Sequence, residues 1–222
     1  MGEAFMAVAR GTPCPFALNA NIEFARPWLS NQSFEENSEH LAADLKSFCA
    51  NARQRNMHGL VLEAAVGARA LSTEGAWASM RMLMTAIASR DRSASESLKS
   101  DRIECRGWQF TVDNTRLFVS LFAPCYPPGH TKHLPALDTV AIFFQPDFSF
   151  DLCGINSQDG RVKNRVRALF ERAGKRYDTE LIDRRIESHI YVSPLQNGDS
   201  PVRWWVADSV KEPGARLRSD NE

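Results

Sequence analysis

Apolar residues recur in the first half of the chain at spacings that are typical of helices. After Ser33, apolar positions follow one another at steps of seven, four, three and four residues, which places them on one face of a helix that runs to about Arg55: Phe34, Leu41, Leu45, Phe48 and Ala52. Ser33 can cap this helix, because Glu36 three residues later completes a capping box. Thr73 is expected to cap a second helix, with Trp77, Met80, Leu83, Met84 and Ile87 on one side.

The middle of the chain has the pattern of strands. Trp108, Phe110 and Val112 alternate with polar residues, and the apolar runs 117–122 and 140–144 follow, the second ended by Pro146. Asp113 and Asn114 predict a turn between the first two strands. The connection is too short for a crossover helix, so these strands are expected to be antiparallel neighbours. Residues 58–66 could form a further short buried strand.

Outside these elements the pattern is weaker. Residues 11–32 are expected to be irregular but packed, and residues 89–100 form a polar surface loop or mobile insertion. A helix is predicted from Arg161 to Gly174, a short helix within 178–188, and edge strands at 191–192 and 202–206.

The order of elements predicts an α+β fold, with an antiparallel sheet of about five strands packed against three to four helices. We expect a single domain over residues 11–208, preceded by a flexible segment, 1–10, and followed by a disordered tail, 209–222. A chain of 222 residues is long enough to bury a core without disulfides.

Composition narrows the function classes. Lysine and arginine number 27 and aspartate and glutamate 27, and zero net charge argues against a nucleic-acid binder and against a polybasic membrane patch. Five widely spaced cysteines without a CxxC motif indicate a reduced protein. The first eleven residues lack the pattern of a signal peptide, and no apolar run approaches the ~20 residues of a membrane span, so we expect a soluble cytoplasmic protein.

No phosphate-binding loop, dinucleotide fingerprint, nucleophile elbow or zinc motif is present. The segment 123–135 is the most informative, because it joins two apolar strands and contains His130 and His133. A single histidine can hold a haem, although both side chains could equally be solvated or hydrogen-bonded in an ordinary loop. Cys14, between two prolines, is either a thiolate ligand of haem or a buried structural thiol.

At these residues the sequence resembles the YqcI/YcgG-like family of bacterial proteins, over residues 11–206. The resemblance rests on the order and spacing of several pieces: Pro13-Cys14, Phe16-Ala17, Trp108-Gln109-Phe110, Leu117-Phe118-Val119, Ala123-Pro124-Cys125-Tyr126-Pro127, His130, His133, Phe143-Phe144-Gln145-Pro146, Arg165, Arg167 and Arg203-Trp204. Characterised relatives are haem proteins that N-hydroxylate guanidine-containing amino acids such as L-arginine in antibiotic or toxin biosynthesis. The resemblance implies a haem-dependent N-oxygenase that uses dioxygen and an external electron donor, with a separate redox partner as one possible source.

The resemblance also implies roles for individual residues. We expect non-covalent haem b, with His130 as the first choice of iron ligand, His133 the second and Cys14 the third. Lys132 and Arg203 are candidates for pairing with the haem propionates; the alternative for each is a solvated charge on the surface.

Two further residues are candidates for contacts with the substrate and the cofactor. Glu63, inside an apolar run, is expected to bind the guanidinium of the substrate, the alternatives being an internal arginine or solvent. Arg26 is another candidate for the propionates, with a solvated surface charge as the alternative. The rival function is a non-catalytic haem, gas or small-ligand sensor with the same fold.

Overall fold

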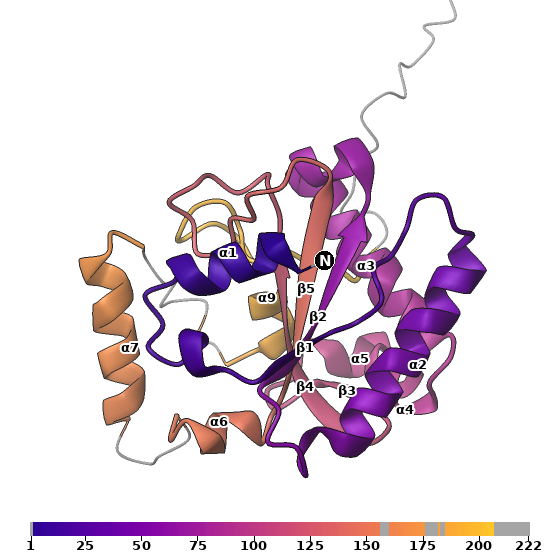
Figure 1. The fold of residues 1–222 in the computed structure, drawn as a ribbon, viewed down its shortest axis with the longest axis horizontal. Helices are drawn as coiled ribbons and strands as arrows, with labels where there is room; N and C mark the ends of the chain where they lie inside the picture. The colour runs from indigo at the N-terminus through magenta and orange to yellow at the C-terminus, as the bar shows by residue number, and fades with distance from the viewer. Residues whose placement is uncertain (1, 156–159, 176–181, 183–184, 207–222) are drawn as a thin grey trace, which may run out of the picture.

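A mixed five-stranded sheet forms the centre of the molecule (Figure 1). The computed structural model describes residues 2–155, 160–175, 182 and 185–206. The strands lie side by side in the order β1 (Ile22–Phe24), β2 (Gly59–Ala65), β5 (Thr139–Pro146), β4 (Thr115–Phe122) and β3 (Phe110–Val112). The α+β fold predicted from the sequence is confirmed.

One edge of the sheet differs from the prediction. Strand β1 pairs in parallel with β2, whereas the other three pairs are antiparallel. The parallel pairing is possible because helix α2 (Phe34–Ala52) lies between the two strands in sequence and serves as the crossover. The expectation of a fully antiparallel sheet is therefore wrong at this edge, where residues 22–24 were expected to be irregular.

The predicted hairpin is present between β3 and β4. Phe110 lies opposite Leu117, and Val112 lies opposite Thr115. Asp113 and Asn114 form the two-residue turn with φ of 46° and 61°. Positive φ at both positions matches the twist of the flanking strands, and Asn and Asp tolerate it better than most residues.

Helices cover both faces of the sheet (Figure 1). Helices α2 and α3 (Thr73–Ala88) pack on the face that contains Leu60, Val119 and Ile142, together with the short helices α4 (Arg92–Ser97) and α5 (Ser100–Ile103). Helices α1 (Glu3–Gly11), α6 (Ser149–Leu152) and α7 (Arg161–Arg172) lie on the other side. The remaining helices are α9 (Glu187–Tyr191) and two 3₁₀ turns, η1 (Ala17–Asn19) and η2 (Gly67–Leu71).

The helix caps follow the sequence closely. The Ser33 hydroxyl accepts a hydrogen bond from the Glu36 amide, and the Glu36 carboxylate accepts one from the Ser33 amide, so the capping box is confirmed. Helix α3 is capped one residue earlier than expected, by Ser72, whose hydroxyl accepts from the Gly75 amide at 3.1 Å.

Three predictions about the chain outside the sheet need correction. The first ten residues are not a flexible segment but contain most of α1, because the Phe5 ring packs 5.2 Å from Phe122 and 5.5 Å from Phe143. The polar segment 89–100 contains α4, held by the buried Ala94 and an Asp91 cap. The described residues thus hold eight α-helices rather than three to four.

The predicted edge strands at 191–192 and 202–206 are absent. Tyr191 ends α9, and its hydroxyl donates to the Leu117 carbonyl in the middle of β4. The Trp204 indole donates to the Ser188 carbonyl at 2.8 Å, which buries this segment against α9 instead of pairing it with a strand. The predicted tail, 209–222, and most of the predicted helix 178–188 lie outside the described residues. Within the described part of the chain, none of the helices combines the length and apolarity that crossing a membrane requires.

Candidate functional site

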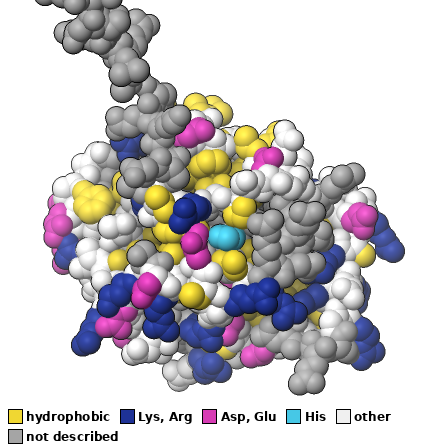
Figure 2. Space-filling view, turned by 180° about the vertical axis from the view of Figure 1, so that it is seen from behind, with side chains coloured by type: hydrophobic (Ala, Val, Ile, Leu, Met, Phe, Trp, Pro, Cys, Tyr) yellow, Lys and Arg dark blue, Asp and Glu magenta, His cyan; other side chains and the backbone are white. Residues whose placement is uncertain are grey.

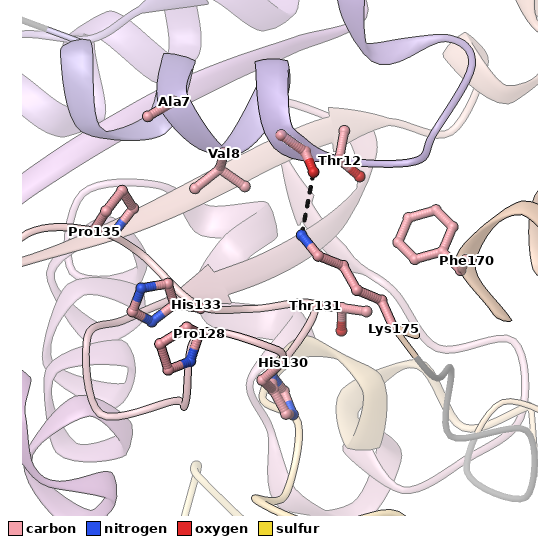
Figure 3. A pocket seen from close by; sticks show the side chains of 11 residues that line it. Ala7, Val8, Thr12, Pro128, His130, Thr131, His133, Pro135, Phe170 and Lys175 are labelled. Atoms are coloured by element: carbon pink, nitrogen blue, oxygen red, sulfur yellow. Dashed lines mark hydrogen bonds between the residues drawn. The ribbon is translucent and has the colours of Figure 1, made fainter. Parts of the chain in front are cut away.

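A cavity of about 110 Å³, partly open to solvent, lies between α1, the loop 123–135 and the C-terminal end of α7 (Figure 3). Both loop histidines line it. The other lining residues are Ala7, Val8, Gly11, Thr12, Pro128, Thr131, Pro135, Phe170 and Lys175. The cavity therefore coincides with the segment to which the sequence analysis assigned chemistry.

The loop 123–135 is held firmly at both of its ends. The Ala123 amide donates to the Lys132 carbonyl, and the Leu134 amide donates to the Ala123 carbonyl, each at 3.1 Å. Tyr126 is completely buried, and its hydroxyl donates to the Ser193 carbonyl at 2.8 Å. A loop anchored in this way can present side chains in fixed positions.

Both ring nitrogens of His130 already have partners. Nδ1 accepts a hydrogen bond from the Lys132 amide at 3.0 Å, and Nε2 lies 3.2 Å from the Pro194 carbonyl, to which only a protonated nitrogen can donate. The ring also stacks on Tyr126 with centroids 4.4 Å apart. Burial lowers the pKa of His130 to about 4, so the ring is neutral at physiological pH.

His133 has one ring nitrogen anchored and the other available. Its Nδ1 lies 2.7 Å from the Tyr126 carbonyl, so Nδ1 carries the proton and donates it. Nε2 then has a lone pair, and it has no hydrogen-bond partner among the described residues. Histidines that bind metals are commonly oriented by such a backbone carbonyl. The geometry thus favours His133 over His130 as an iron ligand, which reverses the expected order.

Lys132 points away from the cavity, toward the sheet. Its Nζ donates to the Ser120 hydroxyl at 2.8 Å and lies 4.8 Å from the centre of the Phe122 ring. Burial lowers the pKa of the Lys132 amine to about 8. From this position Lys132 fastens the loop to β4, and it does not reach a ligand in the cavity.

Glu63 is buried in part, but its carboxylate holds the start of α1. Oε2 accepts a hydrogen bond from the Gly2 amide at 2.9 Å, and Oε1 accepts one from the Phe5 amide at 3.2 Å. A carboxylate at this end also complements the positive end of the helix dipole. The partners of the Glu63 carboxylate are thus backbone amides, and neither an internal arginine nor solvent alone. Glu63 does not line the cavity.

The remaining predicted site residues lie elsewhere. Arg203 pairs with Glu104 at 3.0 Å, and Arg26 pairs with Asp44 at 2.5 Å. Cys14 is half-buried between α1 and η1. None of Arg203, Arg26 and Cys14 lines the cavity.

The cavity contains one cation that sequence reasoning missed. Lys175, just after α7, places its Nζ 3.2 Å from the Gly11 carbonyl (Figure 3). Phe170 and Val8 give the cavity two apolar walls. Nothing in the local sequence marks Lys175 as part of the cavity, because its partner Gly11 lies 164 residues away in the sequence.

A family model decides where this chain belongs. The model of the YqcI/YcgG family matches residues 3–190, which includes α1, the whole sheet and the loop 123–135. The chain belongs to the YqcI/YcgG family. Comparison of this family member with curated proteins and with solved structures gives no match.

The residues of this YqcI/YcgG family member fit a haem in one specific respect. The described residues contain no group of three or more His, Cys, Asp or Glu side chains that could hold a bare metal ion. Haem needs only one side-chain ligand because the porphyrin supplies the others, and His133 Nε2 offers that ligand beside apolar walls. The cation of Lys175 is suited to a propionate.

Proposed function

We propose that this chain is a haem-dependent N-oxygenase that hydroxylates a guanidino nitrogen of L-arginine or a related amino acid in specialised-metabolite biosynthesis. The observation that supports it is the orientation of His133 by the Tyr126 carbonyl, at the wall of a cavity in a chain of this family. One oxygen atom of dioxygen enters the N–H bond, and the other leaves as water. An external donor supplies the two electrons, and two protons come from solvent.

Haem, when bound, supplies the activation of dioxygen. The chain's own residues have the other tasks. Tyr126 fixes the tautomer and direction of the His133 ring, and His130 keeps the loop in place through its two hydrogen bonds. Val8 and Phe170 exclude water from their side of the cavity, which favours the reaction over uncoupled release of reduced oxygen.

The lining of the cavity also bears on the substrate. Lys175 is suited to a carboxylate, either of the amino acid or of a propionate. The described lining contains no acidic side chain, and Glu63 is engaged with α1. The guanidino group would therefore meet neutral acceptors, for which the wall offers the Thr131 hydroxyl and the second lone pair of Thr12 Oγ1, which already accepts from the Cys14 amide at 3.4 Å.

We place the protein in the cytoplasm. All five cysteines are free thiols, and burial raises the pKa of Cys125 to about 11, so this thiol in the loop stays protonated. Free thiols are the usual state in a reducing compartment.

A spectral titration tests the activity. The haem-loaded protein is mixed with L-arginine and related guanidines, and the Soret region is recorded; binding beside the iron shifts the band. Reduced protein with dioxygen and L-arginine is then expected to give a product that is heavier by one oxygen atom. Haem uptake without a shift by any guanidine, together with six-coordinate low-spin iron, would favour the sensor.

A further inference from the structure

Positive charge is concentrated on helix α7 and the three residues that follow it. Between positions 161 and 175 there are six cations and one acid, in a chain whose charges otherwise balance; the cations are Arg161, Lys163, Arg165, Arg167, Arg172 and Lys175. On the face drawn in Figure 2, basic and acidic side chains lie mixed over the lower half of the molecule. Five basic residues and one acid on a helix of 12 residues create a local positive field that the zero net charge of the chain conceals.

Three basic side chains of α7 lie on its exposed side. Lys163, Arg165 and Arg172 are exposed, and none of them forms an ion pair with another described residue. Elsewhere, Arg26 and Arg55 each have a carboxylate partner at 2.5 and 2.6 Å. Lys163, Arg165 and Arg172 thus share one exposed surface of α7 without a carboxylate partner among the described residues.

The same helix forms a wall of the cavity. Phe170 on the inner side of α7 and Lys175 beyond its end line the space that also contains His133 (Figure 3). A protein bound on the outer side of α7 would thus lie one helix away from the candidate iron ligand. This short separation is what electron delivery from outside requires.

We propose that the outer face of α7 is the docking surface for a small acidic one-electron carrier, an iron–sulfur or flavin protein. This inference rests on the proposed function, because an N-oxygenase needs two electrons per turnover. Each encounter oxidises the carrier by one electron and reduces the haem-loaded protein by one. Charge complementarity gives such complexes their fast association and their small, transient interfaces.

Two other anionic partners fit the helix less well. An interfacial membrane helix must insert its apolar side, but in α7 that side faces the protein: Phe170 is buried, and Val162, Val166 and Leu169 are half-buried. A single-stranded nucleic acid needs aromatic side chains on which its bases stack, and α7 has no exposed aromatic residue.

The test measures binding before it measures electron transfer. A plant-type [2Fe–2S] ferredoxin is titrated into the isolated protein by calorimetry at low and at 0.5 M salt. The R165E/R172E double variant is compared with R92E, whose side chain on α4 is 93% exposed and belongs to no wall of the cavity. We expect the double variant to bind at least about tenfold more weakly at low salt, R92E to bind like the wild type, and high salt to abolish the difference.

Electron transfer is the second measurement. Reduction of haem-loaded protein by the ferredoxin is expected to slow about tenfold in the double variant, whereas reduction by dithionite stays unchanged. Equal losses in both variants, or no loss in the double variant, would overturn the proposal, as would α7-dependent binding of phosphatidylserine vesicles without binding of ferredoxin. Because the binding assay needs no haem, its failure is distinguishable from failure of the proposed function.

Discussion

His133 Nδ1 and the Tyr126 carbonyl oxygen lie 2.7 Å apart, which fixes the proton on Nδ1 and leaves Nε2 as the accessible base of the loop. Tyr126 in turn is anchored, because its ring is buried and its hydroxyl donates to the Ser193 carbonyl. The candidate ligand is thus oriented by the interior of the protein. His130, three residues earlier, has the opposite character, since both of its nitrogens serve the loop itself.

Glu63 is expected to act on α1 and not on substrate. The E63Q variant keeps one acceptor but loses the charge at the start of the helix, so we expect a loss of about 0.5–2 kcal/mol in the free energy of unfolding. Hydrogen exchange of the first turn of α1 is expected to accelerate. The matched control is E39Q, an exposed residue on α2, which should change neither quantity. An E63Q variant of normal stability whose Soret band no longer shifts with L-arginine would instead show that Glu63 binds the substrate.

The neutral state of His130 predicts a pH dependence of stability. The folded protein holds the pKa of His130 near 4, whereas the unfolded chain has an ordinary value of 6.5. Between these values the unfolded state binds more protons, so the free energy of unfolding falls as the pH drops from about 6.5 to 4. The H130N variant is expected to show a shallower fall in urea titrations over this range. Identical slopes for variant and wild type would contradict the assignment.

Lys132 predicts an effect at alkaline pH. The pKa of Lys132 is about 8 in the folded protein, whereas the unfolded chain has an ordinary value of 10.5. Between these values the unfolded state binds more protons, so the free energy of unfolding rises with pH. Below pH 8 the buried ammonium lacks a carboxylate partner among the described residues.

Replacing both members of the Lys132–Ser120 contact tests this reasoning. The S120A/K132M double variant is expected to be as stable as the wild type at pH 7, or more stable by up to about 4 kcal/mol, and to lack the rise between pH 8 and 10.5. The S120A single variant serves as the control and should keep the rise. A double variant that unfolds more easily at pH 7 would show that the contact stabilises the fold.

Local features of the fold were predictable from the sequence. The Ser33–Glu36 capping box and the Asp113–Asn114 turn depend on residues within a few positions of each other, and both are present. The N-terminal helix α1 was missed because its stability comes from distant partners: Glu63 supplies its cap, and Phe122 and Phe143 hold Phe5.

In the candidate site, too, the features that depend on distant residues were not predictable from the sequence. The sequence located the histidine loop, but it did not indicate which histidine has a nitrogen to spare. That property depends on two backbone carbonyls, of Tyr126 and Pro194, the second 64 residues from His130. The cation of the cavity, Lys175, contacts α1 across 164 residues and had no local signal.

The central claim, that His133 holds a haem, is tested most directly by hemin titration of three proteins: the wild type, H133N and H130N. Asparagine at either position keeps a hydrogen-bonding amide but offers iron no imidazole, and thermal unfolding checks that each variant is folded. We expect a Soret band in the wild type and in H130N, its loss in H133N, and its recovery when imidazole is added to H133N. A wild type that takes up no hemin, or an H133N variant whose Soret band matches that of the wild type, would contradict the claim.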